Sequence, residues 1–270
     1  MSIRTLAEPL QRAVWGGKAA QLSRAIIAGL PVPPGYALSW QLVDEIARLP
    51  MVHRDHLAAL VSTLDGDVAV RSSAVDEDGV SSSFAGIHET FLHRRHVDDV
   101  IAAVIAVQRS ARSEAALAYR RRHGLSAEPV IAVVLQQMVR PRISGVLFTR
   151  DPVHGHDVRV IEASWGLGEA VVAGMVEPDR VHLGRDGAVA RHVVGRKDIE
   201  LVHQDGGVGE RAVPADRRDA PCLDVEALQA LHGLAADVER VFHDGVAHDV
   251  EFAFDHDGRL WLLQRREVTR

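Results

Sequence analysis

The segment from His248 to Glu267 reads HDVEFAFDHDGRLWLLQRRE, in which two runs rich in apolar residues flank the dipeptide Asp257-Gly258. An Asp-Gly pair between two such runs is a strong signal for a short turn that joins antiparallel strands. The pattern therefore predicts a β-hairpin built from strands at 248–254 and 259–267.

The register of this hairpin places four polar side chains together. A two-residue turn sets Glu251 opposite Gln264 and Asp249 opposite Arg266. Because side chains alternate between the two faces of a strand, these four share one face. The other face then carries Val250, Phe252 and Leu263. A four-residue turn leaves the faces unchanged and a three-residue turn changes them, while Leu262 interrupts the polar face.

Two carboxylates, an amide and a guanidinium on one face suit a magnesium triphosphate. Carboxylate oxygens are ligands that Mg²⁺ prefers, and a guanidinium binds phosphate oxygens through two parallel hydrogen bonds. The alternative is a solvated sheet face with surface ion pairs, which contribute little to stability. The residues alone leave both interpretations open.

The sequence before the hairpin predicts a helix over 224–242 and several strands. Asp224 is a candidate N-cap, and apolar residues recur at helical spacing up to Val241. Four further strands are expected at 130–138, 145–149, 158–163 and 188–194, with turns and glycines between them.

The N-terminal half predicts more helix. The expected elements are a helix at 19–28 ended by Gly29, strands at 35–38 and 68–71, a Ser/Gly/Asp-rich loop at 72–86, and either two helices or one bent helix over 97–122. The fold class is therefore α+β (α/β) with two lobes around a nucleotide cleft. We expect an N-terminal lobe at 1–128, with a phosphate-binding loop and a closing flap, and a C-terminal lobe at 129–270.

Composition narrows the classes of function. The 270 residues carry 37 acidic and 31 basic side chains, a net charge of −6, which does not favour a nucleic-acid-binding surface. Cys222 is the single cysteine, so an intramolecular disulfide is excluded. No secretory leader or long apolar stretch is evident, and we expect a cytoplasmic protein without membrane contact.

Two N-terminal segments are candidates for binding phosphate. In the first, Gly16 and Gly17 let the backbone approach an anion, and Lys18 adds charge at a helix start. In the second, Arg71 ends an apolar strand before a Ser/Gly-rich loop that could fold over a triphosphate. An ordinary turn and an ordinary surface loop remain the alternatives.

Two glycine-containing or polar segments of the C-terminal half could line a nucleotide site. The strand over 133–139 ends in Gln136, Gln137 and Met138, which could contact an adenine ring, although core packing explains most of its pattern. The segment 165–169 is either a close-packed turn or part of the cleft floor.

Taken in order, the motifs resemble the ATP-grasp domain of the phosphoenolpyruvate synthase, pyruvate phosphate dikinase and rifampin phosphotransferase family. The resemblance extends from about Gly16 to the last residues. Its motifs are GGKAAQL, AGLPVPPGY, VAVRSSAVDED, SSFAGIHETFL, QQMVRPRISGVLFTRDP, ASWGLGEAVVAG, EPD, DVEFAF and LWLLQRREVT.

The resemblance implies a role for each matching residue. Lys18 and Arg71 bind ATP phosphates, and Arg266 meets the transferring phosphates, so these three are the implied catalytic residues. Glu251 holds magnesium together with Gln264 or Asp249. The remaining implied ATP contacts are Gly86 and Thr90 in the closing loop and Gln136, Gln137 and Met138 at the adenine.

The resemblance also implies an ATP-dependent phosphotransferase that needs a phosphoryl acceptor. The family carries the phosphoryl group on a histidine in a Thr/Ser-x-His-Ala setting, and His154, His156 and His248 lack that setting. We therefore expect transfer, with AMP and phosphate as co-products, to a histidine on a separate swivelling protein or directly to a small molecule. The segment between Tyr36 and Val68 is shorter than in the family, which predicts a trimmed N-terminal lobe. The alternative function is a nucleotide-binding module without turnover.

Overall fold

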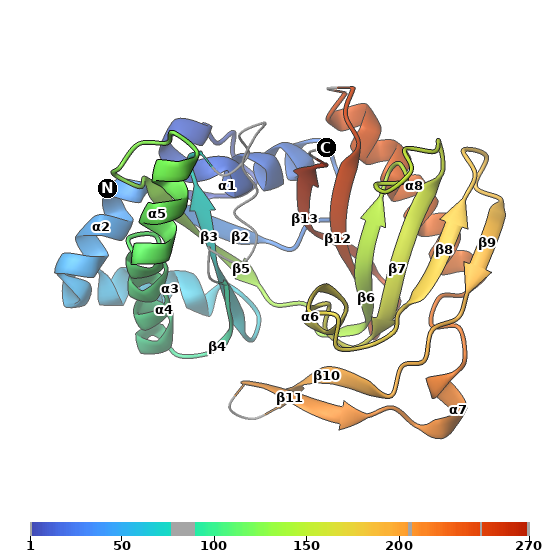
Figure 1. Ribbon diagram of the computed structural model, residues 1–270. Coiled ribbons are helices and arrows are strands. Elements are labelled where there is room, and N and C mark those ends of the chain that lie inside the picture. The colour runs from blue at the N-terminus through green and yellow to red at the C-terminus, as the bar shows by residue number, and fades with distance from the viewer. Residues whose placement is uncertain (1, 77–89, 205–206, 244, 269–270) are drawn as a thin grey trace. The chain divides into compact units, whose positions relative to one another are not determined.

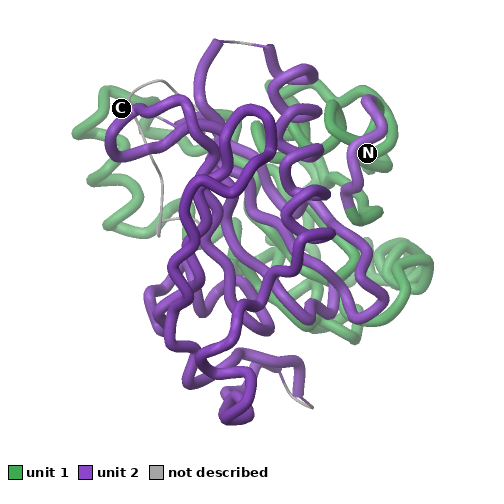
Figure 2. The backbone as a smooth tube through the Cα atoms, turned by 90° about the vertical axis from the view of Figure 1, so that its right-hand side faces the viewer, with its two compact units in different colours: residues 1–27, 33–138, 269 green, residues 28–32, 139–268, 270 purple. Residues whose placement is uncertain are grey.

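The computed structural model describes residues 2–76, 90–204, 207–243 and 245–268, which mix helices with sheets and confirm the α+β class. These residues divide into two compact units (Figure 2). Unit 1 comprises 2–27 and 33–138, and unit 2 comprises 28–32 and 139–268. The predicted boundary after residue 128 would assign the strand Ile131–Gln137 to the C-terminal lobe. The hydrogen bonds of this strand to two strands of unit 1 place it in unit 1.

Unit 1 is built on a five-stranded antiparallel sheet with the strand order β1-β2-β5-β3-β4 (Figure 1). Strand β5 lies at the centre because it pairs with both β2 and β3. The strands are β1 (Ile3–Thr5), β2 (Gly35–Leu38), β3 (Val68–Ala74), β4 (Thr90–Arg94) and β5 (Ile131–Gln137).

Helices cover the sheet of unit 1. They are α1 (Arg12–Ile27), α2 (Trp40–Arg48), η1 (Pro50–His53, a 3-10 helix), α3 (Arg54–Ser62), α4 (Val97–Ser110) and α5 (Glu114–Arg122). Helices α2, α3 and α4 share a buried core with the side chains of β3 and β5 that include Val70 and Leu135. The predicted alternative of two helices over 97–122 is the one that the structure adopts.

Strand β3 continues beyond the predicted end at Arg71. The sequence favoured a loop from Ser72 onward because the stretch 72–86 is rich in serine, glycine and aspartate. In the structure, Ser72, Ser73 and Ala74 pair with β5 and are buried, so sheet pairing overrides the local preference. The prediction of a loop at these three residues is wrong, and 77–89 lie outside the described residues.

Unit 2 is built on a six-stranded antiparallel sheet with the strand order β13-β12-β6-β7-β8-β9. Its strands are β6 (Pro141–Phe148), β7 (Arg159–Trp165), β8 (Asp179–Leu183), β9 (Val189–Val193), β12 (His248–Asp255) and β13 (Leu260–Glu267). A separate hairpin consists of β10 (Ile199–Gln204) and β11 (Gly207–Ala212), and the helices are α6 (Glu169–Val172), α7 (Ala215–Arg218) and α8 (Val225–Val241). Strands β8, β10 and β11 were not among the expected strands.

Helix α8 covers one face of this sheet (Figure 1). Asp224 caps the helix as predicted, because its carboxylate accepts a hydrogen bond of 2.8 Å from the backbone N–H of Ala227. The predicted apolar stripe is buried, and Leu231 and Val238 are fully enclosed.

The terminal hairpin has the predicted pairing but a different turn. Asp249 pairs with Arg266 and Glu251 with Gln264, whereas Phe252 pairs with Leu262. The turn has three residues, since the N–H of Asp255 donates to the carbonyl of Arg259. Leu263 is an extra residue that forms a β-bulge, and the bulge restores the pairing that a three-residue turn would change. Leu262 therefore joins the apolar face, where it is buried, and does not interrupt the polar one.

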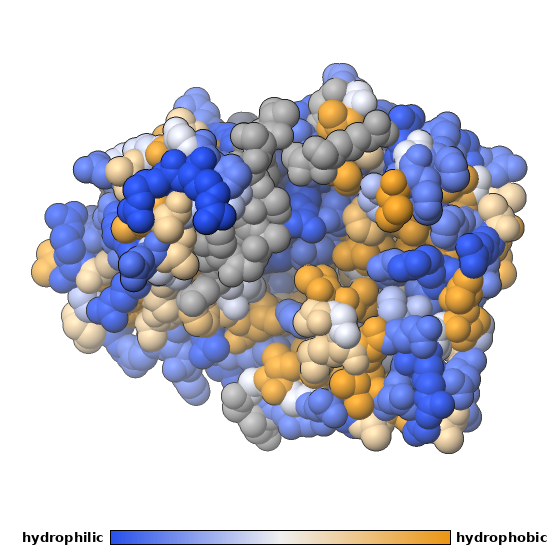
Figure 3. Space-filling view, in the orientation of Figure 1, coloured by the Kyte–Doolittle hydropathy of each residue, from blue (hydrophilic) through white to orange (hydrophobic). Residues whose placement is uncertain are grey.

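The surface shows scattered apolar side chains. In Figure 3 hydrophobic residues gather over α6 and β9, where Val172 and Val189 are exposed. Exposed apolar residues are common on folded proteins and indicate no partner by themselves. Within the described ranges, no helix combines the length and the apolar character needed to cross a bilayer.

Gly16 lets the start of α1 lie against β3. Its φ of 78° interrupts the helical geometry of α1, and an added Cβ would lie 1.9 Å from the carbonyl oxygen of Ser73. Such a contact is shorter than any van der Waals separation, so the backbone would have to move.

We predict that Gly16→Ala destabilises the chain much more than Gly29→Ala does. Gly29 has a φ of 82°, but an added Cβ there meets no atom within 4 Å. Gly29→Ala therefore carries the left-handed backbone penalty alone, about 1–2 kcal/mol, whereas Gly16→Ala adds the clash with β3. Urea denaturation of both variants measures the difference, and equal destabilisation would contradict the close approach of α1 to β3.

Candidate functional site

Arg71 lies on the face of β3 that is opposite the core shared with α2, α3 and α4. Its guanidinium side chain is largely buried, with 9% of the residue exposed. In the sheet it stands between Thr90 on β4 and Val134 on β5. The predicted residues Arg71 and Thr90 are thus direct neighbours across two strands, and Gly86 lies outside the described residues.

Ser73 joins the glycine loop to the same strand. Its hydroxyl donates a hydrogen bond of 2.9 Å to the carbonyl of Trp15 and accepts one of 3.0 Å from the N–H of Ala19. These bonds hold Lys18 in the first turn of the part of α1 that follows Gly16. A helix start with a lysine attracts anions, and Ser73 and Arg71 lie two residues apart on one face of β3.

Gln136 holds Arg71 in position. The Oε1 atom of Gln136 accepts a hydrogen bond of 3.2 Å from Nη1 of Arg71, and its Nε2 atom donates to the carbonyl of Pro33. Only 2% of Gln136 is exposed, so its amide serves the interior of unit 1. An adenine contact by this residue stays a prediction.

Gln137 ends β5 and Met138 follows it, and both residues are partly exposed. The N–H of Gln137 donates to the carbonyl of Pro34, and that of Met138 donates to the carbonyl of Asp67. The backbone of this segment is therefore fixed by unit 1, while the side chains remain accessible for a ligand. Their adenine contacts also stay predictions.

In unit 2, the polar face of the hairpin carries the second group of predicted residues. Arg266 donates a hydrogen bond of 2.7 Å from Nε to Oδ2 of Asp249, and its Nη2 atom lies 2.6 Å from the same oxygen in an ion pair. The Asp249 side chain is 7% exposed and that of Arg266 is 47% exposed. The pair is therefore not a solvated surface ion pair, because its carboxylate is buried. Glu251 and Gln264 lie opposite each other, two residues along the strands.

The Asp249 carboxylate is suited to a cation. Burial raises its pKa above the ordinary aspartate range, the neighbouring Glu251 acts in the same direction, and Arg266 opposes both. Its Oδ1 atom is buried and has no hydrogen-bond partner among the described residues. A buried carboxylate oxygen without a donor gains from a metal ion, so Asp249 and Glu251, with the amide of Gln264, fit Mg²⁺.

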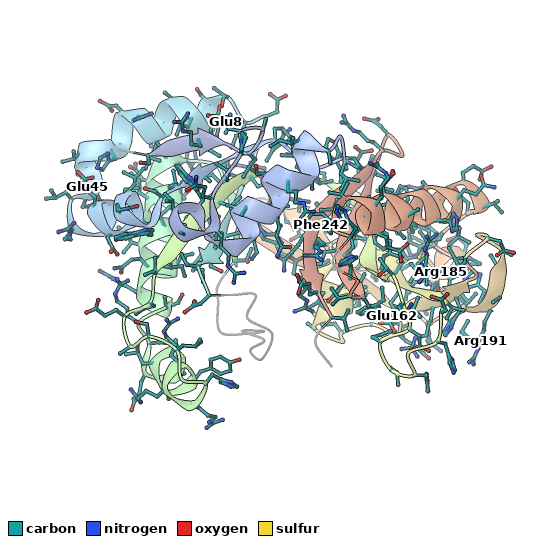
Figure 4. All side chains as sticks on the ribbon, turned by 90° about the horizontal axis from the view of Figure 1, so that it is seen from above. Glu8, Glu45, Glu162, Arg185, Arg191 and Phe242 are labelled. Carbon is teal, nitrogen blue, oxygen red and sulfur yellow. The ribbon has the colours of Figure 1, made fainter. Side chains whose placement is uncertain are left out.

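Arg265 serves the opposite face of the same strand. Its guanidinium lies 4.4 Å from the ring centroid of Phe242, and its Nε donates to Nδ1 of His248. Phe242, which is labelled in Figure 4, directly follows α8. Arg265 is buried, whereas Arg266 is exposed. Adjacent arginines of β13 thus separate into one that packs on Phe242 after α8 and one that is exposed beside Asp249.

The segment 165–169 is a close-packed turn in the described structure. The N–H of Leu167 donates to the carbonyl of Leu201 at 2.8 Å, and the hydroxyl of Ser144 donates to the carbonyl of Gly166. A Cβ on Gly166 would lie 2.3 Å from the carbonyl oxygen of Leu201. The segment therefore packs closely within unit 2, as the first interpretation predicts, and its place in a cleft floor stays a prediction.

A buried ion pair in unit 2 was missed by the sequence analysis. Nζ of Lys197 donates to Oδ1 of Asp179 at 2.5 Å, and both side chains are fully buried. The N–H groups of Gly195 and Cys222 donate to the same carboxylate. Asp179 belongs to the EPD motif, but no spacing in the sequence connects it with Lys197. Through Lys197 and Cys222, the Asp179 carboxylate connects β8 to the segments before and after the β10–β11 hairpin.

Each unit by itself presents a group of polar side chains: cationic groups in unit 1, and carboxylates, an amide and an arginine in unit 2. These groups are of the residue types that the resemblance to the ATP-grasp domain implies. The chain belongs to the family described as the AMP/ATP-binding domain of pyruvate phosphate dikinase, whose profile matches residues 41–270. The resemblance seen in the motifs is confirmed.

Relatives with assigned names are similar over most of the chain. The prodigiosin synthesizing transferase PigC of Serratia marcescens is 38% identical, over 94% of this chain and 31% of its own length. A probable phosphoenolpyruvate synthase of Methanothermobacter thermautotrophicus is 31% identical, over 94% and 44%. A rifampicin phosphotransferase of a Streptomyces species is 36% identical, over 74% and 23%. The chain thus spans less than half the length of each of these relatives.

Solved structures are also similar at low sequence identity. An ADP complex of N5-carboxyaminoimidazole ribonucleotide synthetase is 10% identical with a TM-score of 0.45, over 94% of this chain and 45% of that one. A biotin carboxylase of Campylobacter jejuni is 15% identical with a TM-score of 0.41, over 92% and 38%.

We predict that Lys197→Met lowers the free energy of unfolding by about 3–5 kcal/mol, because Asp179 is left as a buried charge without its cation. The matched control is Arg196→Ala, which removes an exposed partner of Asp198 and costs at most about 1 kcal/mol. Urea denaturation of both variants is the measurement. Similar midpoints for the two would show that the buried pair does not hold unit 2 together.

Proposed function

We propose that this chain binds ATP with Mg²⁺ and acts as the nucleotide-binding part of a dikinase-type phosphotransferase. The observation that carries the proposal is the hairpin of unit 2, where a buried carboxylate oxygen without a donor adjoins a second carboxylate and an exposed arginine. Membership of an AMP/ATP-binding domain family supports the nucleotide as the ligand.

The proposed role of each residue follows from its charge. Lys18 and Arg71 bind phosphate oxygens, as cationic groups on a helix start and a buried strand are suited to do. Asp249, Glu251 and Gln264 hold magnesium, which when bound supplies the charge that offsets negative charge on the triphosphate. Arg266 orients the transferring phosphates and stabilises the charge that develops on them.

Asp249 has a further task within this scheme. Its Oδ2 atom holds the Arg266 guanidinium through a hydrogen bond and an ion pair, while its Oδ1 atom is available for the cation. One carboxylate therefore couples the position of the phosphate-binding arginine to the metal. In unit 1, Gln136 similarly restricts the rotamers of Arg71.

The proposed reaction transfers a phosphoryl group from ATP, with AMP and phosphate as co-products. The acceptor is a histidine on a separate swivelling protein or a small molecule. The names of the relatives include a phosphoenolpyruvate synthase and a rifampicin phosphotransferase, which supports a small molecule as the final acceptor. A nucleotide-binding module without turnover is the competing function.

We predict a separation of effects in calorimetric titrations with ATP in the presence of Mg²⁺ and in the presence of EDTA. Lys18→Ala and Arg71→Ala weaken ATP binding under both conditions, by about tenfold or more, because each removes a charge-assisted hydrogen bond. Glu251→Gln weakens binding with Mg²⁺ and leaves binding in EDTA close to wild type.

The matched controls are Arg122→Ala and Glu226→Ala, which remove exposed charges on α5 and α8 and should bind as wild type does. Product analysis then separates the two candidate functions, since AMP and phosphate are released with turnover and neither is formed by a binding module. Wild-type affinity in all three site variants would refute the site, and no binding at millimolar ATP would refute the function.

A further inference from the structure

The loop between β6 and β7 gathers one carboxylate and two imidazoles. Asp151, His154 and His156 come from the sequence DPVHGHD, and each offers a ligand atom within 4.8 Å of the others. The Oδ2 atom of Asp151 lies 3.0 Å from Nδ1 of His154 and 3.6 Å from Nδ1 of His156. The proposed ATP function uses none of these residues.

The loop fixes the Asp151 carboxylate in one orientation. Its Oδ1 atom accepts hydrogen bonds from the backbone N–H groups of Val153 at 2.9 Å and His154 at 3.1 Å. The N–H of Asp151 donates to the carbonyl of His156, which closes the loop on itself. Oδ1 is thus committed to the turn, and Oδ2 is directed toward the two imidazoles.

The charge and exposure of the three side chains suit a cation. The backbone N–H of His154, followed by that of Val153, lowers the pKa of the Asp151 carboxyl to about 2, so it is ionised at neutral pH. The Asp151 side chain is 5% exposed, whereas the imidazoles of His154 and His156 are 65% and 72% exposed. A fixed anion therefore lies beneath two rings that an ion can reach from solvent.

The spacing of the ligand atoms matches that around a small transition-metal ion. Bonds from zinc to nitrogen or oxygen are about 2.0–2.1 Å, which separates two tetrahedral ligands by about 3.3 Å. The two distances from Oδ2, 3.0 Å and 3.6 Å, lie on either side of that value. The two ring centroids lie 5.4 Å apart with an interplanar angle of 16°, and the Nδ1 atoms of both rings lie beside the same carboxylate oxygen.

We propose that Asp151, His154 and His156 form a binding site for a divalent transition-metal ion such as zinc. Imidazole nitrogens select zinc, cobalt, nickel or copper over magnesium, which prefers oxygen ligands. Three protein ligands leave a coordination position for water or another small ligand. The site is separate in composition from the carboxylate and amide cluster of the hairpin.

The place of the loop in the fold gives the ion a defined effect. Phe148, the last residue of β6, pairs with Asp249, and Thr149 exchanges hydrogen bonds with His248. An ion on Asp151 restrains the chain two residues beyond Thr149, beside the start of β12. Metal occupancy should therefore stabilise the end of β6 and the start of β12.

The test is a titration of the full chain, without a polyhistidine tag and without nucleotide, with Zn²⁺ by calorimetry and with Co²⁺ by visible absorption. We expect one ion per chain. His154→Ala and His156→Ala each lower the affinity by at least about tenfold, and the double variant abolishes binding at this site. Asp151→Asn keeps an oxygen for the two backbone N–H groups, so it lowers the affinity with the loop intact.

The matched control is the double variant His56→Ala/His123→Ala, which removes two exposed imidazoles elsewhere and should bind the ion as wild type does. Far-UV circular dichroism confirms that each variant is folded. Two results overturn the proposal: no binding of Zn²⁺ or Co²⁺ to the wild-type chain at micromolar concentrations, or undiminished binding in the His154→Ala/His156→Ala variant. Because no nucleotide is present, neither result bears on ATP binding.

Discussion

One extra residue in β13 determines which side chains share the polar face of the terminal hairpin. With a three-residue turn and no bulge, Asp249 would stand opposite Arg265, and Arg266 would turn toward the apolar layer. Leu263 shifts the register by one position, so Arg266 reaches Asp249 while Arg265 packs on Phe242. The polar cluster of unit 2 depends on this shift, because without it Asp249 and Arg266 would lie on opposite faces of the hairpin.

The pairing of the hairpin was predicted correctly, although one step of the reasoning was wrong. Alternation and the Asp-Gly signal gave the two strands and the partners of Glu251 and Asp249. The turn is one residue longer than assumed, and the bulge at Leu263 compensates for it. Turn signals and alternation did not predict the bulge, because it reflects the burial of Leu262 opposite Phe252. The apparent interruption of the polar face by Leu262 was the one available signal.

The parts of the site that could not be predicted depend on contacts between distant segments. Ser73 bonds to Trp15 and Ala19, more than fifty residues away in the chain, and only the folded sheet brings these together. The pairing of Asp179 with Lys197 is similar, since a buried lysine is not distinguishable from a surface lysine by spacing. The family resemblance identified candidate residues. The structure of each unit explains how these side chains are oriented, since Gln136 accepts a hydrogen bond from Arg71.

The two cation sites proposed in unit 2 differ in the chemistry of their ligands, and this difference keeps their roles apart. The hairpin offers carboxylate and amide oxygens, which suit an ion that must also bind phosphate and exchange with each nucleotide. The loop at Asp151 offers two imidazoles on a carboxylate already fixed by backbone donors, which suits an ion that stays bound. Ligand type alone would therefore direct magnesium to the hairpin and a transition metal to the loop, although β6 connects the two regions directly through its pairing with β12.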